Sequence, residues 1–399
     1  MKVLLVGMVD SVHVARWLAN LDQSFQIQLR ILPSSPHRKL HPGVRKLLNS
    51  ERPVSITIHP FLRVFSLPIW LLDQLPLFDG WIRAQFLRRD ILKFQPHLVH
   101  IMETQNGGYP ALRALESLDA TRHKGSRAKV ILTLFGSDLF WFARFPSHEQ
   151  KLKRLLPRID YLAAECERDL EHAAKLGFHG RFLPLSPVSA GVAESQIFDP
   201  TSLNFGQRRA ITVKGYGGTW GLGHKAIEAL GQLPRQLSGY KVIVYSAERA
   251  SRRAAKKYLK PQGIDYAVFR KHELSHSQML ALFSKSRMYI GLSLSDGLPA
   301  SLLEAMSQGA FPIQTDSACT GGWISNGING EVVEVENSQL VESVARSIRK
   351  ALGSDDLVIS AALSNIDLVR EKYSLDSTNS SVSWSYQNLI KDRSKSHDK

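Results

Sequence analysis

Two carboxylates, Asp296 and Glu304, are the residues of this chain whose type and spacing best fit a chemical role. They lie eight positions apart in the string SLSDGLPASLLEAMSQGAFPIQTD, residues 293–316. The string predicts a strand, a loop at Asp296, and then a helix of about ten residues between Pro299 and Gly309. Since a carboxylate accepts hydrogen bonds from sugar hydroxyls, the pair suits a ribose or a hexose. On spacing alone, an exposed loop aspartate and an ordinary helix glutamate would be the simpler explanation.

A Gly-rich loop after Lys214 is the second candidate site. Lys214 ends an apolar strand, and the segment GYGGTWGLGHK that follows leads into a helix with Lys225 at its start. A cation, loop amides and a helix start in this order suit a diphosphate group. The loop is not a dinucleotide fingerprint, because no acidic residue follows it at about twenty positions.

Polar residues also accompany the predicted strands of the N-terminal half. Asp138 comes directly after a buried strand, which favours a place in a ligand cleft over a role as a helix cap. His13 lies in the first turn of a helix near Asp10, and it is either structural or in contact with a ligand; both interpretations remain open. His100 lies inside a strand, which favours a core histidine with satisfied hydrogen bonds.

The elements that must position these residues are two successive runs of short apolar strands that alternate with helical segments. This rhythm predicts an α/β fold with parallel sheets covered by helices on both faces. We expect two Rossmann-like domains, residues 1–205 and 206–372, and a C-terminal helix with a frayed polar tail at 373–399. The expected strands are 2–6, 26–32, 97–102, 129–135, 161–164 and 181–183 in the first run, and 210–214, 240–246, 266–270, 288–293 and 311–314 in the second.

Residues 36–94 stand outside this rhythm because they are long, basic and aromatic. One interpretation is a helical excursion whose Phe, Trp and Leu side chains pack on the first domain. The other is a surface that meets a membrane or a lipid-linked substrate, with a cluster of basic residues attracted to anionic lipid. The cluster consists of Arg38, Lys39, Arg45 and Lys46.

The composition indicates a globular protein with a strong positive charge. Of 399 residues, 43% are hydrophobic and 22% are charged, which excludes a disordered chain. The net charge of +15 favours anionic partners: phosphorylated metabolites, nucleic acid or an anionic membrane surface. The start MKVLLVGMVD is typical of a strand and not of a signal peptide, so we expect a cytoplasmic protein.

Several strings of this sequence, taken together, resemble retaining GT-B glycosyltransferases of family 4. The 293–316 string is similar to the donor-site motif of that family, and Glu304-Ala305-Met306 and Gly309 match it directly. It departs from the motif where Asp296 replaces a Glu and Leu298–Pro299 replaces an aromatic–Gly pair. Other segments fit the family in order along the chain: SVHVARW (11–17), PHLVHIMETQNGGYPAL (96–112), LTLFGSD (132–138) and TGGWISNGINGEVVE (320–334). Two histidines that are common in the family are replaced here by Met102 and Phe135.

The resemblance implies a GT-B fold, two Rossmann-like domains facing a central cleft, and transfer of a hexose from a nucleotide sugar with retention. It implies that the catalytic residues are Asp296 and Asp138, that the donor is bound by Glu304, Gly297, Leu298, Lys214 and Lys225, and that His13, Gly7 and Glu103 line the cleft or the acceptor site. The acceptor would be a glycan, a lipid-linked molecule or another small molecule. Because no Asp-x-Asp element occurs in a plausible donor loop, we expect no metal and no cofactor beyond the donor.

Two other functions remain as alternatives. A nucleotide-sugar epimerase or hydrolase of the same fold would turn over the donor without an acceptor. A non-catalytic polyanion-binding or membrane-binding protein would bind anions with a steep salt dependence and would not bind nucleotide sugars. We expect no nucleic acid partner, because the basic run at 249–260 contains only one aromatic residue and is more typical of a solvated helix face.

Overall fold

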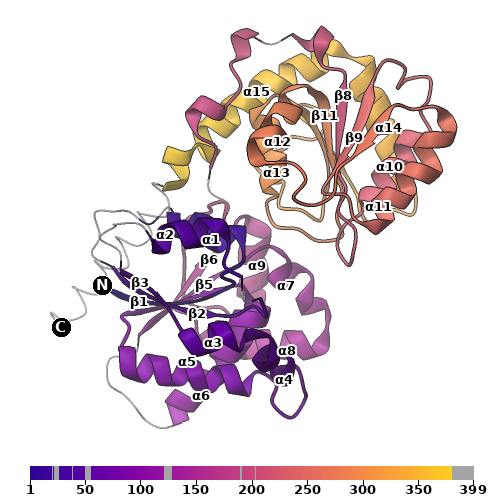
Figure 1. The fold of residues 1–399 in the computed structure, drawn as a ribbon. Coiled ribbons are helices and arrows are strands. Elements are labelled where there is room, and N and C mark those ends of the chain that lie inside the picture. Colours follow the sequence, from indigo (N-terminus) through magenta and orange to yellow (C-terminus); the bar gives the residue numbers. More distant parts are fainter. Residues whose placement is uncertain are drawn as a thin grey trace. The chain divides into compact units, whose positions relative to one another are not determined.

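The chain forms two α/β units, each built around one parallel sheet, in a computed structural model (Figure 1). The structure describes residues 1–19, 21, 27–37, 39–49, 55–120, 128–188, 191–202 and 204–379. Unit 1 comprises Met1–Ala190 and the segment that begins at Thr378, and unit 2 comprises Gly191–Ser377. Residues 191–205 therefore group with unit 2 by contact, and Val192 pairs with Ser374 near the C-terminal end of that unit. The predicted polar tail from 380 onward lies outside the described residues.

Unit 1 contains a seven-stranded sheet in the order β3-β2-β1-β4-β5-β6-β7, and all its neighbouring strands are parallel. Its strands are β1 (Lys2–Gly7), β2 (Gln28–Pro33), β3 (Ser55–Ile58), β4 (Leu98–Met102), β5 (Lys129–Thr133), β6 (Tyr161–Ala163) and β7 (Arg181–Phe182). Its helices are α1 (Val12–Ala19), α2 (Pro42–Leu48), α3 (Pro60–Val64), α4 (Ser66–Asp73), α5 (Trp81–Phe94), α6 (Tyr109–Ala120), α7 (Ser137–Phe140), α8 (Pro146–Leu155) and α9 (Glu167–Lys175).

The central strand β1 explains why this sheet is buried on both faces. Leu4 and Val6 belong to one hydrophobic cluster, whereas Val3 and Leu5 belong to the other. Successive side chains of a strand point to opposite faces, so a nearly continuous apolar run is what a doubly covered strand requires. His100 of β4 is buried as predicted, and its Nε2 lies 2.7 Å from Thr133 Oγ1.

Unit 2 contains a six-stranded parallel sheet in the order β10-β9-β8-β11-β12-β13. Its strands are β8 (Ala210–Lys214), β9 (Lys241–Tyr245), β10 (Tyr266–Val268), β11 (Ser286–Gly291), β12 (Phe311–Thr315) and β13 (Glu331–Val333). Its α-helices are α10 (Gly223–Gly231), α11 (Arg249–Ala254), α12 (His276–Ser284), α13 (Ala300–Ser307), α14 (Leu340–Gly353) and α15 (Asp355–Tyr373).

The helix of the donor-site string is shorter than predicted. Pro299 is the residue before α13 and not its first residue, because its ψ of 119° is extended. Gly309 lies just past the helix with a φ of +72°, the left-handed conformation that favours glycine at this place. The prediction also missed β3, a four-residue edge strand in which exposed and half-buried residues alternate.

The segment 36–94 forms α2 to α5 together with β3, and a buried ion pair anchors it. Arg83 Nε lies 2.7 Å from Asp73 Oδ2, and the exposed fractions of these side chains are 6% and 0%. The Arg83 guanidinium also donates to the carbonyls of Ser34 and Asn106, both at 2.9 Å. Trp70 Nε1 donates to Asn106 Oδ1 at 2.9 Å. The excursion is therefore fastened to the loop that follows β4.

Replacing Arg83 with Met should destabilise the protein strongly. The change leaves the buried Asp73 carboxylate without its cation, and breaking one side of a buried pair costs about 3–5 kcal/mol. Urea unfolding of the variant and of the unchanged protein measures this difference. As a control, Arg349→Met removes the partner of Glu342 in an exposed pair and should cost less than about 1 kcal/mol. Equal losses in the two variants would contradict the assigned role of the buried pair.

Candidate functional site

The loop that carries Asp296 follows β11 and is held by residues from the neighbouring strand β12. The amide of Ser293 donates to Thr315 Oγ1 at 3.0 Å, and Ser317 Oγ donates to the carbonyl of Ser293. The amide of Cys319 donates to the carbonyl of Gly297 at 3.0 Å. Parallel strands end at the same edge of a sheet, so the fold fixes this loop at the carboxyl edge, where open α/β sheets bind ligands.

Lys214 and Asp296, which are 82 positions apart, form the central pair of this edge. Lys214 Nζ lies 3.0 Å from Asp296 Oδ2, and it also lies 4.4 Å from the centre of the Tyr216 ring. Burial opposes the charged form of Lys214, but the Asp296 carboxylate, together with Tyr289 and Tyr216, holds the pKa of Lys214 above its ordinary value. The site thus keeps a charged ammonium group whose carboxylate partner is about a third exposed.

The Gly-rich loop between β8 and α10 has little room for side chains. A Cβ at Gly215 would lie 2.7 Å from Ala247 Cα, and a Cβ at Gly221 would lie 2.3 Å from the Tyr216 carbonyl carbon. The loop packs against the Asp296 segment, because the amide of Leu294 donates to the carbonyl of Trp220 at 2.7 Å. These glycines let the backbone after Lys214 pack closely on Ala247 and fold tightly on itself at Tyr216.

Lys225 lies at the start of the helix after the Gly-rich loop, as the sequence predicts. It lies in the first turn of α10, and its Nζ is 3.0 Å from Glu228 Oε2 of the same helix. Its side chain is 40% exposed. The structure therefore brings Lys214, and not Lys225, into contact with Asp296.

Glu304 faces a residue that the sequence did not single out. Its carboxylate Oε1 lies 3.0 Å from His276 Nε2, and Glu304 is only 8% exposed. His276 is the first residue of α12, behind the N-cap Ser275, whose hydroxyl accepts from the amide of Gln278. No spacing signal links α12 to α13, so only the packing of these two helices reveals the His276–Glu304 pair.

The start of α13 offers backbone donors beside Asp296. The amide of Gly297 donates to the Asp296 carboxylate at 3.0 Å, and Leu298 is buried. Within the described part of the chain, no hydrogen bond is formed by the amides of Ala300 and Ser301, the first two residues of the helix. Such amides carry the positive end of the helix dipole and suit an anionic or strongly polar ligand group.

In unit 1, Glu103 occupies the carboxyl end of β4 in a strained conformation. Its φ of 73° and ψ of 156° are rare for any residue except glycine. The carboxylate accepts from the amides of Gln105 at 2.9 Å and Asn106 at 2.8 Å, at the start of the π-helical turn Thr104–Gly108. Burial, and then the nearby Asp138, raise the pKa of Glu103 to about 8, although the amides of the turn oppose this shift.

Asp138 lies at the same edge, after β5. Its carboxylate accepts from the amide of Thr104 at 2.6 Å and from the amide of Phe135 at 2.5 Å. Burial raises the pKa of Asp138 in spite of these hydrogen bonds. The His13 and Phe135 rings are 5.2 Å apart between centres. The structure thus brings His13, Glu103 and Asp138 into one chain of contacts through Thr104 and Phe135.

Gly7 is part of the packing around this edge. A Cβ at this position would lie 3.2 Å from Val14 Cγ2 and 3.7 Å from the Cβ of the buried Met102. The carbonyl of Gly7 accepts from the amide of Ser34 at 3.1 Å. Gly7 therefore allows α1 to approach the end of β1.

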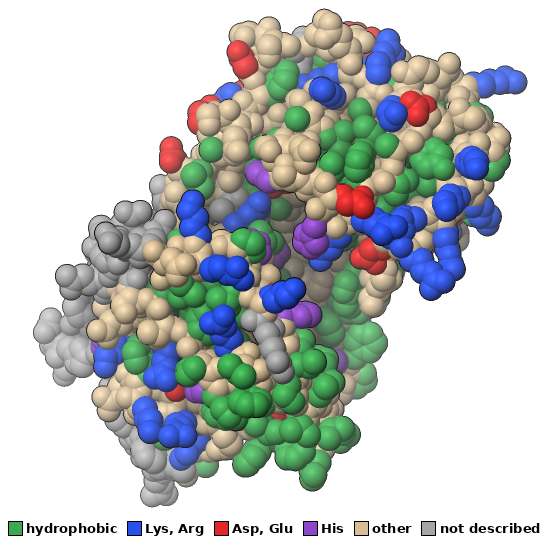
Figure 2. Space-filling view, viewed as in Figure 1, with side chains coloured by type: hydrophobic (Ala, Val, Ile, Leu, Met, Phe, Trp, Pro, Cys, Tyr) green, Lys and Arg blue, Asp and Glu red, His purple; other side chains and the backbone are tan. Residues whose placement is uncertain are grey.

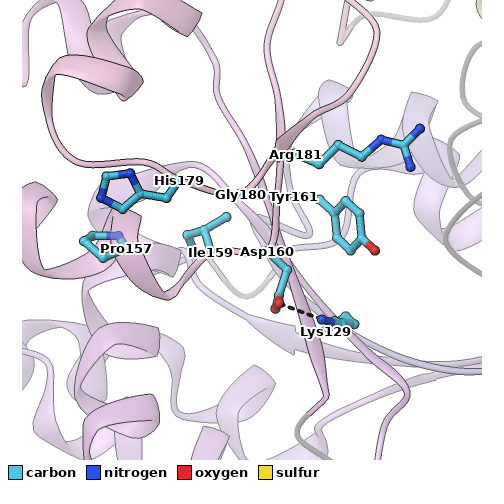
Figure 3. Close-up of a pocket in the computed structure, with 8 residues that line it drawn as sticks. All are labelled: Lys129, Pro157, Ile159, Asp160, Tyr161, His179, Gly180 and Arg181. Atoms are coloured by element: carbon cyan, nitrogen blue, oxygen red, sulfur yellow. Dashed lines mark hydrogen bonds and ion pairs between the residues drawn. The ribbon is translucent and has the colours of Figure 1, made fainter. Parts of the chain in front are cut away.

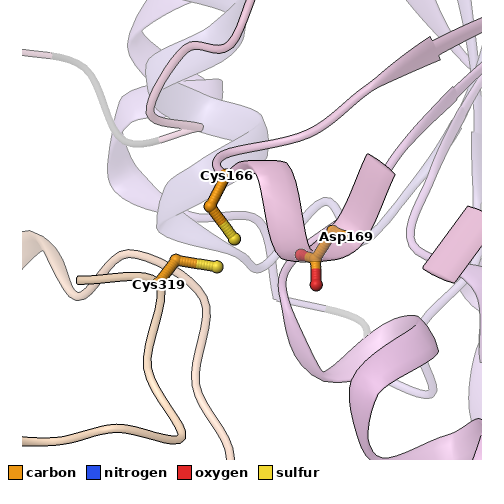
Figure 4. Close-up of side chains that lie close together, drawn as sticks. All are labelled: Cys166, Asp169 and Cys319. Carbon is orange, nitrogen blue, oxygen red and sulfur yellow. The ribbon is translucent and has the colours of Figure 1, made fainter. Parts of the chain in front are cut away.

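A third buried carboxyl group of unit 1 lies at the start of α9. Figure 4 shows Asp169 in the first turn of this helix, which follows Cys166. Asp169 Oδ1 lies 3.0 Å from Arg168 Nε. Burial raises the pKa of Asp169 to about 6 although Arg168 opposes it, and Asp138 adds to the increase. Carboxyl groups with raised pKa values thus gather in this part of unit 1.

A surface pocket of about 310 Å³ lies at the opposite edge of the unit 1 sheet. Figure 3 shows its lining at the amino ends of β5, β6 and β7, where Lys129, Tyr161 and Arg181 begin the strands. Lys129 Nζ lies 3.0 Å from Asp160 Oδ1 in this pocket. None of the catalytic or binding residues that the sequence predicts lines this pocket.

The raised pKa of Glu103 predicts a pH-dependent effect of Glu103→Gln on stability. At pH 6 the folded protein holds a proton on Glu103 that the unfolded chain lacks. Because the folded state binds more protons, the free energy of unfolding falls as the pH rises toward the folded-state pKa. Between pH 6 and 9 the free energy of unfolding should fall by about 2–3 kcal/mol more in the unchanged protein than in Glu103→Gln. Guanidinium unfolding at both pH values measures the difference. A constant gap between the two proteins would show that Glu103 is already ionised at pH 6.

Comparison with known proteins supports the two-unit architecture. Residues 221–359 match the family described as Glycosyl transferases group 1, and no curated protein sequence matches the chain. HepE from Anabaena, solved in complex with UDP, has a TM-score of 0.63 at 12% identity, and the match covers 97% of this chain and 100% of that one. A glycosyltransferase from Rickettsia africae has a TM-score of 0.66 at 14% identity, and the match covers 98% of both chains. Sucrose-phosphate synthase from Thermosynechococcus elongatus gives 0.67 at 11%, covering 98% and 99%.

These findings agree with the predicted fold class. The two parallel-sheet α/β domains of the GT-B fold are confirmed by the sheet topology and by the similar solved structures. The family match falls within unit 2 and includes Asp296 and Glu304. Unit 2 therefore carries a Glycosyl transferases group 1 domain, within a chain that has the GT-B fold.

Proposed function

We propose that the protein is a family 4 type glycosyltransferase that transfers a hexose from a nucleotide sugar with retention at the anomeric carbon. The observation that carries the proposal is the Lys214–Asp296 pair beside the start of α13, in the unit that matches the group 1 family. The similar Anabaena protein was solved with UDP, with UDP and glucose, and with UDP-glucose, which favours a UDP-hexose donor here.

In this proposal, each residue of the unit 2 edge has a distinct role. Glu304 accepts hydrogen bonds from the ribose hydroxyls, and Asp296 with the amides of Gly297 and Leu298 holds the hexose. The Lys214 ammonium group faces the diphosphate and stabilises the negative charge that develops as the bond to the anomeric carbon breaks. His276 holds Glu304 in place through the 3.0 Å contact and is a positioning residue.

The acceptor side is assigned to the carboxyl edge of unit 1. His13, Gly7 and Glu103 line it, and Asp138 acts there as the second catalytic residue. The acceptor oxygen forms the new bond to the anomeric carbon, and its proton passes to the departing diphosphate oxygen. Because Lys214 and the helix amides supply positive charge, we propose a reaction without metal or other cofactor. The acceptor is a glycan, a lipid-linked molecule or another small molecule, used in the cytoplasm or at the cytoplasmic face of a membrane.

Thermal unfolding with a panel of nucleoside diphosphates and their sugars tests the donor class. A ligand at about a hundred times its dissociation constant adds roughly 2.7 kcal/mol to the stability of the folded protein, which gives a clear shift. We expect UDP and a UDP-hexose to give the largest shifts. A panel without any shift would contradict the proposal, and turnover of the donor with no acceptor present would favour an epimerase or hydrolase.

Variants of the two carboxylates should separate ribose binding from hexose binding. Glu304→Gln keeps the shape but loses an acceptor, so the affinity for UDP should fall by about tenfold to a hundredfold, equivalent to roughly 1.5–3 kcal/mol. The affinity for the UDP-hexose should fall nearly as much, because the ribose is common to both ligands.

Asp296→Asn should behave in the opposite way. It should keep UDP affinity, because UDP lacks the hexose that Asp296 is proposed to hold and its diphosphate brings negative charge to Lys214, and it should lower the rate of hexose transfer. Calorimetry and initial rates with both variants measure these outcomes. A loss of UDP affinity in Asp296→Asn that is absent from Glu304→Gln would mean that the two roles are reversed.

A further inference from the structure

An exposed apolar surface covers α3, α4 and the turn into α5. Nine large apolar side chains between positions 61 and 81 are more than a third exposed, out of eighteen such side chains among the described residues of the whole chain. Leu77 is 87% exposed, and Val64 and Leu71 are each 53% exposed. Figure 2 shows hydrophobic side chains gathered on the part of unit 1 that carries α3 and α4. A patch of this kind marks an interaction site.

The helix α4 turns most of its leucines toward water and buries polar residues on its inner side. Its inner side buries Ser66, Ile69 and Asp73, and its outer side exposes Leu67, Leu71 and Leu72. A surface helix ordinarily places polar residues on the side that faces water. The outer side of α4 is therefore built for an apolar environment.

The charges of this region are complementary to an anionic partner. Among the described residues 55–95, the exposed charged residues are Arg63, Arg89 and Lys93, and all three are cationic. Of the three acids in this range, Asp73 and Asp90 are buried. The third, Asp79, lies 2.7 Å from Arg113 and 2.6 Å from Lys151, which neutralise it.

We propose that this apolar surface docks on a lipid bilayer that contains anionic lipids. Apolar side chains would enter the boundary between headgroups and acyl chains, while the cationic side chains meet the headgroups. A second copy of the chain fits less well, because a two-fold dimer through this patch would bring identical cationic side chains together. Within the described residues, no helix is both long and apolar enough to span a bilayer, so docking would be peripheral.

Two residues of the basic cluster that the membrane interpretation names lie on another helix of unit 1. Arg38 is outside the described residues, and Arg45 and Lys46 belong to α2, which packs against α1. By contrast, α3 packs on β2 and α4, and α4 packs on α5. The structure thus shifts the proposed contact from the cationic cluster to the apolar side chains of α3 and α4.

The docking surface is fastened to the proposed acceptor side of unit 1. Trp70 of α4 donates to the side chain of Asn106, and Arg83, which is paired with Asp73 at the end of α4, donates to the Asn106 carbonyl. Asn106 belongs to the turn whose amides donate hydrogen bonds to the Glu103 carboxylate. Resting on the proposed function, this link favours a lipid-linked acceptor among the three classes of acceptor.

Co-sedimentation with vesicles tests the docking surface. The unchanged protein should sediment with phosphatidylcholine vesicles that contain phosphatidylglycerol, and less with phosphatidylcholine alone. The double variant Leu71→Glu/Leu77→Glu should bind about tenfold more weakly or worse, because two exposed leucines no longer transfer into lipid. A matched control, Ile328→Glu/Leu363→Glu, changes exposed side chains of unit 2 and should keep full binding. A blue shift of Trp fluorescence on vesicle addition, from the half-exposed Trp81, should accompany binding.

Three outcomes would overturn the proposal. They are no vesicle binding by the unchanged protein, equal binding by the Leu71/Leu77 variant, and a dimer in sedimentation equilibrium that this variant dissociates. Circular dichroism and UDP calorimetry on the same variants show that the fold and the donor site are intact. Loss of vesicle binding with normal UDP affinity concerns the docking surface alone. Failure of UDP to bind any of the proteins concerns the proposed function alone.

Discussion

The contact on which the candidate donor site depends is the 3.0 Å ion pair between Lys214 and Asp296. It exists because β8 and β11 are neighbours in the sheet and end at the same edge. Burial alone would discourage a charged lysine there, and the carboxylate, with help from Tyr289 and Tyr216, keeps the pKa of Lys214 above its ordinary value. The hydrogen bond from the Leu294 amide to the Trp220 carbonyl joins the two loops, and Thr315 and Ser317 hold the Asp296 loop through hydrogen bonds with Ser293. Substituting either partner therefore changes the charge of the whole edge.

At the carboxyl edge of unit 1, by contrast, Glu103 and Asp138 are buried without an ion pair to a cation of the described residues. Glu103 and Asp138 are satisfied mainly by backbone amides, and burial raises the pKa of both groups. The strained backbone of Glu103 persists because its own side chain holds the turn that follows. Phe135 and Met102, which stand where the family resemblance implies histidines, make this edge less polar than the resemblance would imply. A neutral Glu103 is consistent with such surroundings.

The helical segment between β2 and β4 has a buried charged pair on its inner side and exposed leucines on its outer side. On the inner side, Arg83 pairs with Asp73 and donates a hydrogen bond to the Asn106 carbonyl. On the outer side, leucines of α4 are in contact with water. A buried ion pair is costly to form because both charges lose their contact with water. Four further hydrogen bonds made by Asp73 and Arg83 offset this cost here. The helices α4 and α5 are therefore tied to the sheet side of unit 1 through Ser34 and Asn106, while the leucines of α4 face water.

The sequence by itself determined the α/β class, most strands and the place of the donor-site string, because buried parallel strands and helix ends leave strong local patterns. β8 was predicted to the residue, whereas the four-residue edge strand β3 was missed because alternating exposure leaves too few apolar residues. Tertiary structure decided which residues meet. It paired Lys214 with Asp296 and Lys225 with Glu228, and it placed His276 against Glu304. It also showed that the leucines of α4 face outward. These contacts join residues distant in the chain, and their formation depends on strand order and helix packing, which local spacing does not encode.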